Sequence, residues 1–307
     1  MKKVVGWLSL VAMLVMGAMP GLAAARAAQV DSAVSDELIS RLGYPLVEIH
    51  AGPEGVDAPV WIAPGPVHVR LSVADGYIGY VNIVRPPDGL DPVLEEPQML
   101  LAGAHDLAQA GWTYFGGTNT PSPGETASFV ISLAPGEYRV AASYYTAGDP
   151  SDEVMALSRL TVGGATPAAL PVDMTGPAAD VTLTMTDDLR YLVTPDAVPR
   201  GPHIWKLENT GTIHAHHVVI FRVPAGYSDE EIVAEYQKLK DGESPAPGSF
   251  VSQLSWAAYA AMQSAGTVTW TEFDFEPGTY AAICFNLDPD SRQPHVLEGM
   301  VTQFVVE

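Results

Sequence analysis

The 307-residue chain contains a single cysteine, Cys284. One thiol cannot form an intrachain disulfide, and it cannot build an iron–sulfur cluster or a cysteine-rich zinc site. Basic residues are also scarce, because 15 lysines and arginines stand against 36 acidic residues, for a net charge of −21. Such an acidic chain repels phosphate backbones and anionic lipids, so we expect no binding to nucleic acid or to membrane surfaces.

Long apolar runs are missing except at the N-terminus, where Lys2 and Lys3 precede the run Val4–Met19 and small residues follow it. This pattern predicts a signal peptide over residues 1–28, cleaved near Ala25–Ala28. An uncleaved anchor is the alternative, although the run is short for a membrane span. We therefore expect an exported protein, periplasmic or extracellular, whose mature chain is not inserted in a membrane. Without the leader, 12 basic and 36 acidic residues give a net charge of −24.

Hydrophobic residues make up 47% of the chain, enough to build folded cores. Short alternating or β-branched runs, such as Val67–Val73, Phe129–Leu133 and Val268–Phe275, are bounded by turns rich in glycine and proline. Many short strands with such turns are typical of β-sandwiches and barrels. The sequence therefore predicts an all-β fold.

The two halves of the chain resemble each other. Similar segments recur in the same order, with Val84–Gly89 and Leu133–Tyr138 in the first half and Phe221–Gly226 and Phe275–Tyr280 in the second. We predict two tandem β-sandwich domains of one type, over residues 45–165 and 181–307, with the join between Gly163 and Asp180.

Helices are predicted only as short pieces. The sequence Ser228-Asp-Glu-Glu231 is a capping box, which predicts a helix that ends near Asp241 inside the second domain. Two further short helices are predicted over Asp31–Leu42 and Phe250–Met262.

A group of metal-ligand residues lies in the second half. Cys284, His295 and Met300 have the spacing Cys-x10-His-x4-Met, and three histidines, His214, His216 and His217, lie upstream. A thiolate and two imidazoles in a trigonal arrangement, with a weak axial thioether, form a blue-copper electron-transfer site. Such a site also accounts for an unpaired thiol in an exported protein.

The second half resembles the cupredoxins, the type 1 blue-copper family. The resemblance rests on the turns Asn209-Thr-Gly211 and Pro277-Gly-Thr-Tyr280, one of the upstream histidines, and the loop with Cys284, His295 and Met300. It covers residues 181–307 and, through the internal repeat, 45–165. It implies Greek-key β-sandwiches, one copper ion and electron transfer, with no catalytic residue and no other cofactor.

The resemblance also implies a role for each ligand. Cys284 supplies strong electronic coupling, His295 lies near the surface and relays electrons, and Met300 tunes the reduction potential. The first ligand is one of three histidines. Its place just before the apolar strand favours His216, and an alignment on Phe221 favours His217, with His214 third.

The first half lacks these residues. Ala142 stands at the cysteine position, and Gly79-Tyr80-Val-Asn replaces the histidine segment, so we predict a metal-free copy. The remaining histidines form no spacing pattern and are expected to be structural or exposed. These are His50, His68, His105 and His203.

Three functions stay open from the sequence. Electron transfer, with a redox partner of basic charge, is favoured. A copper carrier or store, or a metal-free interaction module, is the alternative. A two-domain copper oxidase or nitrite reductase is less favoured, because such enzymes connect a second copper through a histidine beside the cysteine, and Cys284 lies between Ile283 and Phe285. Imidazoles bind metals only when they are neutral. The affinity for copper is therefore expected to fall as the pH falls through the histidine titration range.

Overall fold

The structure is a computed structural model that describes residues 37–90, 110–121, 123–147, 149–163 and 175–307. The predicted signal peptide over residues 1–28, His105 and most of the predicted join lie outside the described residues. Among the residues that are described, no helix is long and apolar enough to cross a membrane.

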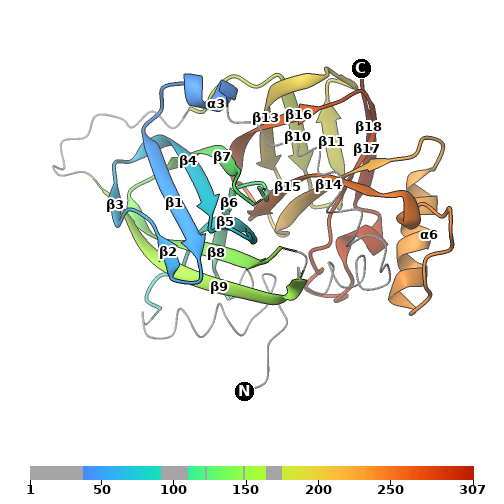
Figure 1. Ribbon diagram of the computed structural model, residues 1–307, viewed down its shortest axis with the longest axis horizontal. Coiled ribbons are helices and arrows are strands. Elements are labelled where there is room, and N and C mark those ends of the chain that lie inside the picture. Colours follow the sequence, from blue (N-terminus) through green and yellow to red (C-terminus); the bar gives the residue numbers. More distant parts are fainter. Residues whose placement is uncertain (1–36, 91–109, 122, 148, 164–174) are drawn as a thin grey trace.

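The described chain is mostly strands, which confirms the prediction of an all-β fold (Figure 1). One sheet has eight strands in the order β11–β10–β13–β16–β7–β4–β1–β2. In chain order these are β1 (Leu46–Gly52), β2 (Gly55–Asp57), β4 (Gly65–Val73), β7 (Thr126–Leu133), β10 (Val181–Met185), β11 (Tyr191–Thr194), β13 (Gly201–Asn209) and β16 (Val268–Phe275).

The second sheet has ten strands in the order β12–β18–β17–β14–β15–β6–β5–β8–β9–β3. In chain order these are β3 (Trp61–Ile62), β5 (Tyr77–Arg85), β6 (Thr113–Gly117), β8 (Gly136–Thr146), β9 (Asp149–Val162), β12 (Ala197–Val198), β14 (His216–Val223), β15 (Ser255–Gln263), β17 (Gly278–Ile283) and β18 (Val301–Val306).

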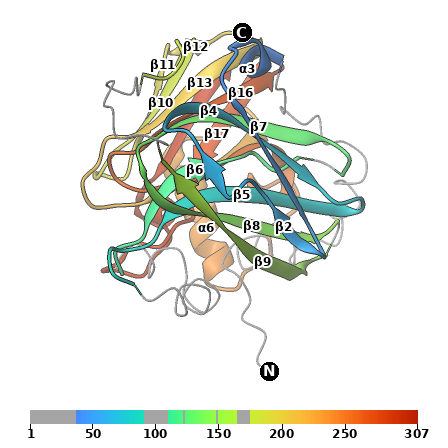
Figure 2. The same cartoon turned by 90° about the vertical axis from the view of Figure 1, so that its left-hand side faces the viewer.

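In each sheet the strand order is palindromic, because the strands of one half and their counterparts in the other half follow the same order from opposite edges. In the first sheet, for example, β2–β1–β4–β7 from one edge correspond to β11–β10–β13–β16 from the other. The centre of the first sheet is the antiparallel pair β7–β16, in which Val130 lies opposite Trp270. The centre of the second is the pair β6–β15, in which Phe115 lies opposite Gln263. Each sheet therefore runs through both halves of the chain, as Figures 1 and 2 show.

Each half has its own hydrophobic core between the two sheets. One core is built from residues between Val47 and Val162, and the other from residues between Val181 and Val306. In the second core the ring of Trp205 packs against Phe273, Phe275 and Phe304 at centroid distances of 5.5–5.6 Å. Burial of such large apolar side chains stabilises each core by roughly 1.5–3 kcal/mol per residue.

Two of the predicted helices are present in the described residues. The short helix α3 (Glu37–Arg41) lies within the predicted window Asp31–Leu42. The capping box at Ser228 starts α6 (Asp229–Lys240), as predicted, with both of its hydrogen bonds formed. On its inner face α6 buries Ile232, Tyr236 and Leu239.

The predicted helix over Phe250–Met262 is wrong. A 3₁₀ turn, Val251–Gln253, is followed by strand β15, which pairs with β14 on one side and with β6 on the other. The alanine-rich sequence has good helix propensity, but as a strand it buries Ala257–Gln263 on both faces. Tertiary pairing overrides the local preference here.

Candidate metal centre

Four predicted ligand residues lie at the ends of neighbouring elements. His216 is the first residue of β14, and Cys284 directly follows β17. His295 starts a 3₁₀ turn, His295–Glu298, and Met300 directly precedes β18. The segments that carry them are therefore adjacent at one end of the second half.

The register between β14 and β17 decides which side chains face each other. Val219 pairs with Ile283, so Val218 lies opposite Cys284. Because side chains alternate along a strand, His216 shares the inner face with Val218 and Cys284, whereas His217 points to the outer face. Val218 and Cys284 belong to the same core, and Val219 and Ile283 belong to the cluster on the other face.

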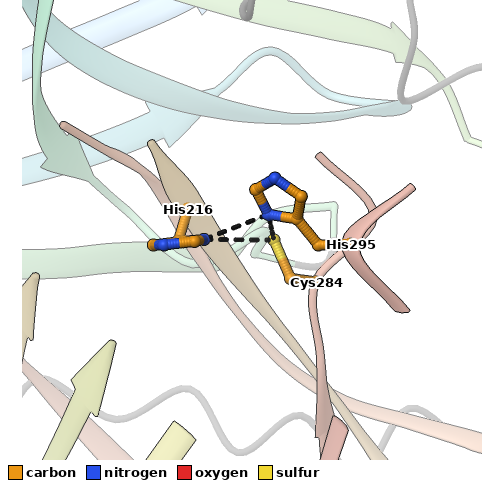
Figure 3. Close-up of side chains that lie close together, drawn as sticks. All are labelled: His216, Cys284 and His295. Atoms are coloured by element: carbon orange, nitrogen blue, oxygen red, sulfur yellow. Dashed lines mark hydrogen bonds between the residues drawn. The ribbon is translucent and has the colours of Figure 1, made fainter. Parts of the chain in front are cut away.

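Three donor atoms converge on the inner face (Figure 3). Nδ1 of His216 lies 3.1 Å from Nδ1 of His295, and the Cys284 sulfur lies 3.5 Å from His295 Nδ1 and 4.0 Å from His216 Nδ1. Donors that each lie about 2.0–2.3 Å from one ion are at most about 4.6 Å apart, so the three atoms fit a single ion. All three residues are 0% exposed.

Met300 is tied to this group through the backbone. Its N–H donates to the His295 carbonyl at 2.9 Å, and its carbonyl accepts from the Cys284 N–H at 3.2 Å. The preceding residue, Gly299, has φ of +100°, a conformation that favours glycine. The side chain of Met300 is fully buried in the same core as Cys284.

The other two upstream histidines have different partners. His217 Nε2 accepts the N–H of Phe285 at 3.0 Å, so this nitrogen connects β14 to the segment after Cys284. Burial lowers the pKa of His217 to about 3, which keeps the ring neutral and able to accept. His214 faces Asp288, with Nδ1 and Oδ2 3.7 Å apart.

The segment that leads into His216 is held by side chains that the sequence analysis did not single out. Asp187 accepts hydrogen bonds from the N–H groups of Thr212, Ile213 and His214. Burial opposes its ionisation, but these bonds prevail and lower the pKa of Asp187 to about 2. Asn286 Nδ2 donates to the Ala215 carbonyl at 2.6 Å.

The environment of the donors favours neutral groups. Burial raises the pKa of the Cys284 thiol to about 11, although N–H groups of His217 and Asn286 and the Tyr191 hydroxyl oppose the shift. Burial, and then the neighbouring His295, lower the pKa of His216 to about 3. Near neutral pH, His216 therefore offers a lone pair, whereas the thiol keeps its proton until a metal displaces it.

The side chain of His295, which the resemblance places near the surface, is fully buried. The long Cys-to-His interval folds back on itself, with the Asp288 N–H donating to the Gln293 carbonyl and the His295 N–H donating to the Asn286 carbonyl, both at 2.8 Å. The His214 ring packs edge-on against the His295 ring at 5.5 Å.

The first half also contributes to the burial of this region. Ala215, which directly precedes His216, packs in one cluster with first-half residues. These are Val84, Trp112, Tyr114 and Ala141, and the second-half residue Met262 completes the cluster.

The equivalent position in the first half has the same backbone pairing but no donor atoms. Asn82 pairs with Ala141 there, so Ala142 lies where Cys284 lies in the second half. A Cβ added to Gly79, the counterpart of His216, would lie 2.6 Å from the Ser143 carbonyl. Of the described residues, those that form candidate metal groups all lie in the second half.

The other described histidines have separate partners. His68 is buried and lies 2.9 Å from the Ser128 hydroxyl, and His50 lies 3.1 Å from the Ser72 hydroxyl. His203 forms a pair with Asp180 at 3.3 Å.

Comparisons with known proteins give structural likenesses only. No family model and no curated protein matches the chain. An auracyanin from Roseiflexus castenholzii is 20% identical, with 41% of this chain and 94% of that chain covered and a TM-score of 0.26. A multi-copper oxidase from Pediococcus acidilactici is 12% identical, with 87% and 61% covered and a TM-score of 0.22.

A copper-containing nitrite reductase from Thermus scotoductus is 9% identical, with 85% of this chain and 61% of that chain covered and a TM-score of 0.21. The chain thus spans 61% of the length of the multi-copper oxidase and 61% of the length of the nitrite reductase. Because the identities and TM-scores are low, we take neither a cofactor nor an activity from these likenesses.

Replacement of Asp187 by alanine is expected to destabilise the fold by about 1 kcal/mol at neutral pH, after allowance for solvent screening. The folded pKa of about 2 lies below the ordinary value of 3.8, so this stabilisation is present above about pH 4 and is lost as the pH falls towards 2. Urea denaturation of the wild type and the variant measures the difference in their free energies of unfolding at pH 7 and at pH 2.5. Asp188→Ala, at the exposed neighbouring carboxylate, is the control, and an equal effect of the two substitutions would contradict the prediction.

The affinity for a divalent ion is expected to rise about tenfold per pH unit between pH 5 and 8, because ion binding displaces the thiol proton. The sequence predicts acid sensitivity from the imidazoles, but the His216 pKa of about 3 means that protons do not compete for that ring in this range. Competition between a chelator and the protein for Zn²⁺ measures the slope, with Cys284→Ala as the control whose affinity should depend less on pH. An affinity that is flat over this range would show that Cys284 does not bind as a thiolate.

Proposed function

We propose that this chain binds one copper ion through His216, Cys284 and His295, with Met300 as a weak fourth ligand, and that it transfers electrons. The observation that carries the proposal is the convergence of two imidazole nitrogens and one sulfur within 4.0 Å of one another. Two imidazoles, a thiolate and a weakly bound thioether suit copper in both oxidation states. When bound, copper would supply reversible one-electron chemistry.

Burial and rigidity favour electron transfer over chemistry on a substrate. The three donor residues are fully buried, and a substrate would have to displace packed side chains to reach an ion held between them. The donors lie at strand ends that are tied together by backbone hydrogen bonds between Cys284, His295 and Met300. Ligands held this firmly change little between oxidation states, which lowers the reorganisation cost of electron transfer.

The domain organisation is part of the same proposal. We propose two cupredoxin-like Greek-key domains, over residues 45–165 and 181–307, of which the first is a metal-free copy. The separate cores and the palindromic strand order support this division. The first domain would serve as a scaffold, because it continues both sheets and packs against Ala215 next to the ligand His216.

The location and the partner are also proposed from the sequence. An exported chain with a cleaved leader would carry a net charge of −24. Such charge favours a basic redox partner over nucleic acid or anionic lipid.

Copper loading tests the proposed function. The purified chain without residues 1–28, supplied with Cu²⁺, is expected to show an intense blue absorption band and narrow copper hyperfine splitting in EPR. Both arise from the bond between copper and the Cys284 sulfur, so Cys284→Ala should abolish them. Met300→Leu should keep the band but change the reduction potential, because it replaces only the weak ligand.

His50→Gln is the matched control, because His50 lies in the first half and contacts Ser72 instead of the candidate ligands. A colourless copper complex, or a weak spectrum that survives Cys284→Ala, would leave a carrier or an interaction module as the better reading. Steady turnover of nitrite or dioxygen would favour the oxidoreductase.

Electron exchange with small redox reagents tests the charge argument. Oxidation of the reduced protein by a cationic metal complex is expected to slow as salt is added, because screening weakens the attraction. Oxidation by an anionic complex should accelerate over the same range. Equal salt dependence for the two reagents, measured by stopped-flow absorbance, would contradict steering by the acidic surface.

A further inference from the structure

A second group of donor atoms lies beside the first. It consists of His214, Asp288 and His295, whose ligand atoms all lie within 4.8 Å of one another. His214 lies in the connection between β13 and β14, and Asp288 lies in the interval between Cys284 and His295. The proposed function uses neither His214 nor Asp288.

The contacts of His214 and Asp288 point to a ligand. His214 Nδ1 is buried and has no hydrogen-bond partner. Its distance of 3.7 Å from Asp288 Oδ2 is too long for a hydrogen bond. Two donors on one tetrahedral ion at 2.0–2.1 Å lie about 3.3 Å apart, so a small movement would bring both atoms to an ion.

Asp288 is held in place independently of His214. Its Oδ1 atom accepts the N–H of Asp290 at 2.9 Å and the N–H of Ser291 at 2.7 Å. Burial opposes ionisation, but these bonds lower the pKa of Asp288, so the carboxylate is charged at neutral pH. A buried carboxylate beside a buried ring nitrogen that has no hydrogen-bond partner is costly unless a cation joins them.

We propose that His214, Asp288 and His295 bind a second divalent ion, of the borderline class that includes Zn²⁺. Two imidazoles and one carboxylate suit Zn²⁺ better than Ca²⁺ or Mg²⁺, which prefer oxygen ligands. The three residues would fill three of the four positions around a tetrahedral ion, and water would fill the fourth. This inference uses the second donor group and does not rest on copper binding at the first.

His295 serves both groups through different ring nitrogens. The distances within the first group all involve Nδ1. Figure 3 shows the other ring nitrogen of His295 on the side away from Cys284, so Nε2 would hold the second ion. With both ions bound, the ring would lose its N–H proton to solvent and bridge them as an imidazolate, and the charge of the second ion would favour the reduced state of the first.

Zinc titration of the Cys284→Ala protein tests the second site without copper. We expect one equivalent of Zn²⁺ by calorimetry. Adding His214→Gln or Asp288→Asn to this background should weaken binding at least about tenfold, because each removes a ligand. His216→Gln should weaken binding less than either substitution, because His216 contacts the ligand His295 but is not a ligand of this group. Far-UV circular dichroism checks that every variant is folded.

Asp180→Asn is the matched control, because Asp180 forms a similar pair with His203, at 3.3 Å, and no third donor joins them among the described residues. The proposal is overturned if no zinc binds. It is also overturned if His216→Gln abolishes binding while Asp288→Asn does not, since the ion would then lie in the first group.

The same zinc titration is then carried out on wild-type protein loaded with copper, which keeps Cys284. We expect it to take up a second equivalent as Zn²⁺, with release of a proton and a shift of the copper absorption. Asp288→Asn should prevent both changes. If the copper-loaded protein binds no zinc, the proposal that His295 serves both groups is wrong, whatever the colour of the first site.

Discussion

The register of one strand pair determines where the candidate ligands lie. Because Val219 of β14 pairs with Ile283 of β17, the inner face of the sheet receives both His216 and Cys284. A slip by one residue would turn His217 inward and place His216 in the outer cluster. The contact from Phe285 N–H to His217 Nε2 holds this register at the point where β17 ends.

The same pairing in the first half shows that the backbone alone does not make the site. β5 and β8 pair with the equivalent register, yet Gly79 and Ala142 stand where the imidazole and the thiol would be. The contact of a Gly79 Cβ with Ser143 shows that this copy has closed the space for a side chain. What the first half retains is its ability to continue both sheets and to cover the start of β14.

Local patterns predicted the parts of the molecule that local forces control. The capping box at Ser228 and the alternating strands formed as expected, because their signals lie within a few residues. The helix expected over Phe250–Met262 failed because pairing with β14 and β6 outweighs the propensity of alanine. The burial of His295 could not be predicted, since the fold of the interval after Cys284 and the position of His214 depend on residues distant in sequence.

The positions of the three upstream histidines depend on the same long-range information. Alternation along a strand separates His217 from His214 and His216, but it does not say which face is inner. The pairing with β17 supplies that answer. The role of Asp187 has no signal in sequence at all, because its partners Thr212, Ile213 and His214 lie 25 to 27 residues away in another connection.

Burial keeps the donor groups neutral, and this affects how an ion would bind to them. A thiol with a pKa of about 11 and an imidazole with a pKa of about 3 are both held neutral, so these two buried donors carry little charge near neutral pH. An ion that enters must displace the thiol proton, and in return it meets donors that are already positioned. The same hydrogen bonds that hold Cys284, His295 and Met300 before the ion arrives would limit their movement when its charge changes. Because backbone hydrogen bonds tie these three residues to one another, the site would suit electron exchange with little rearrangement.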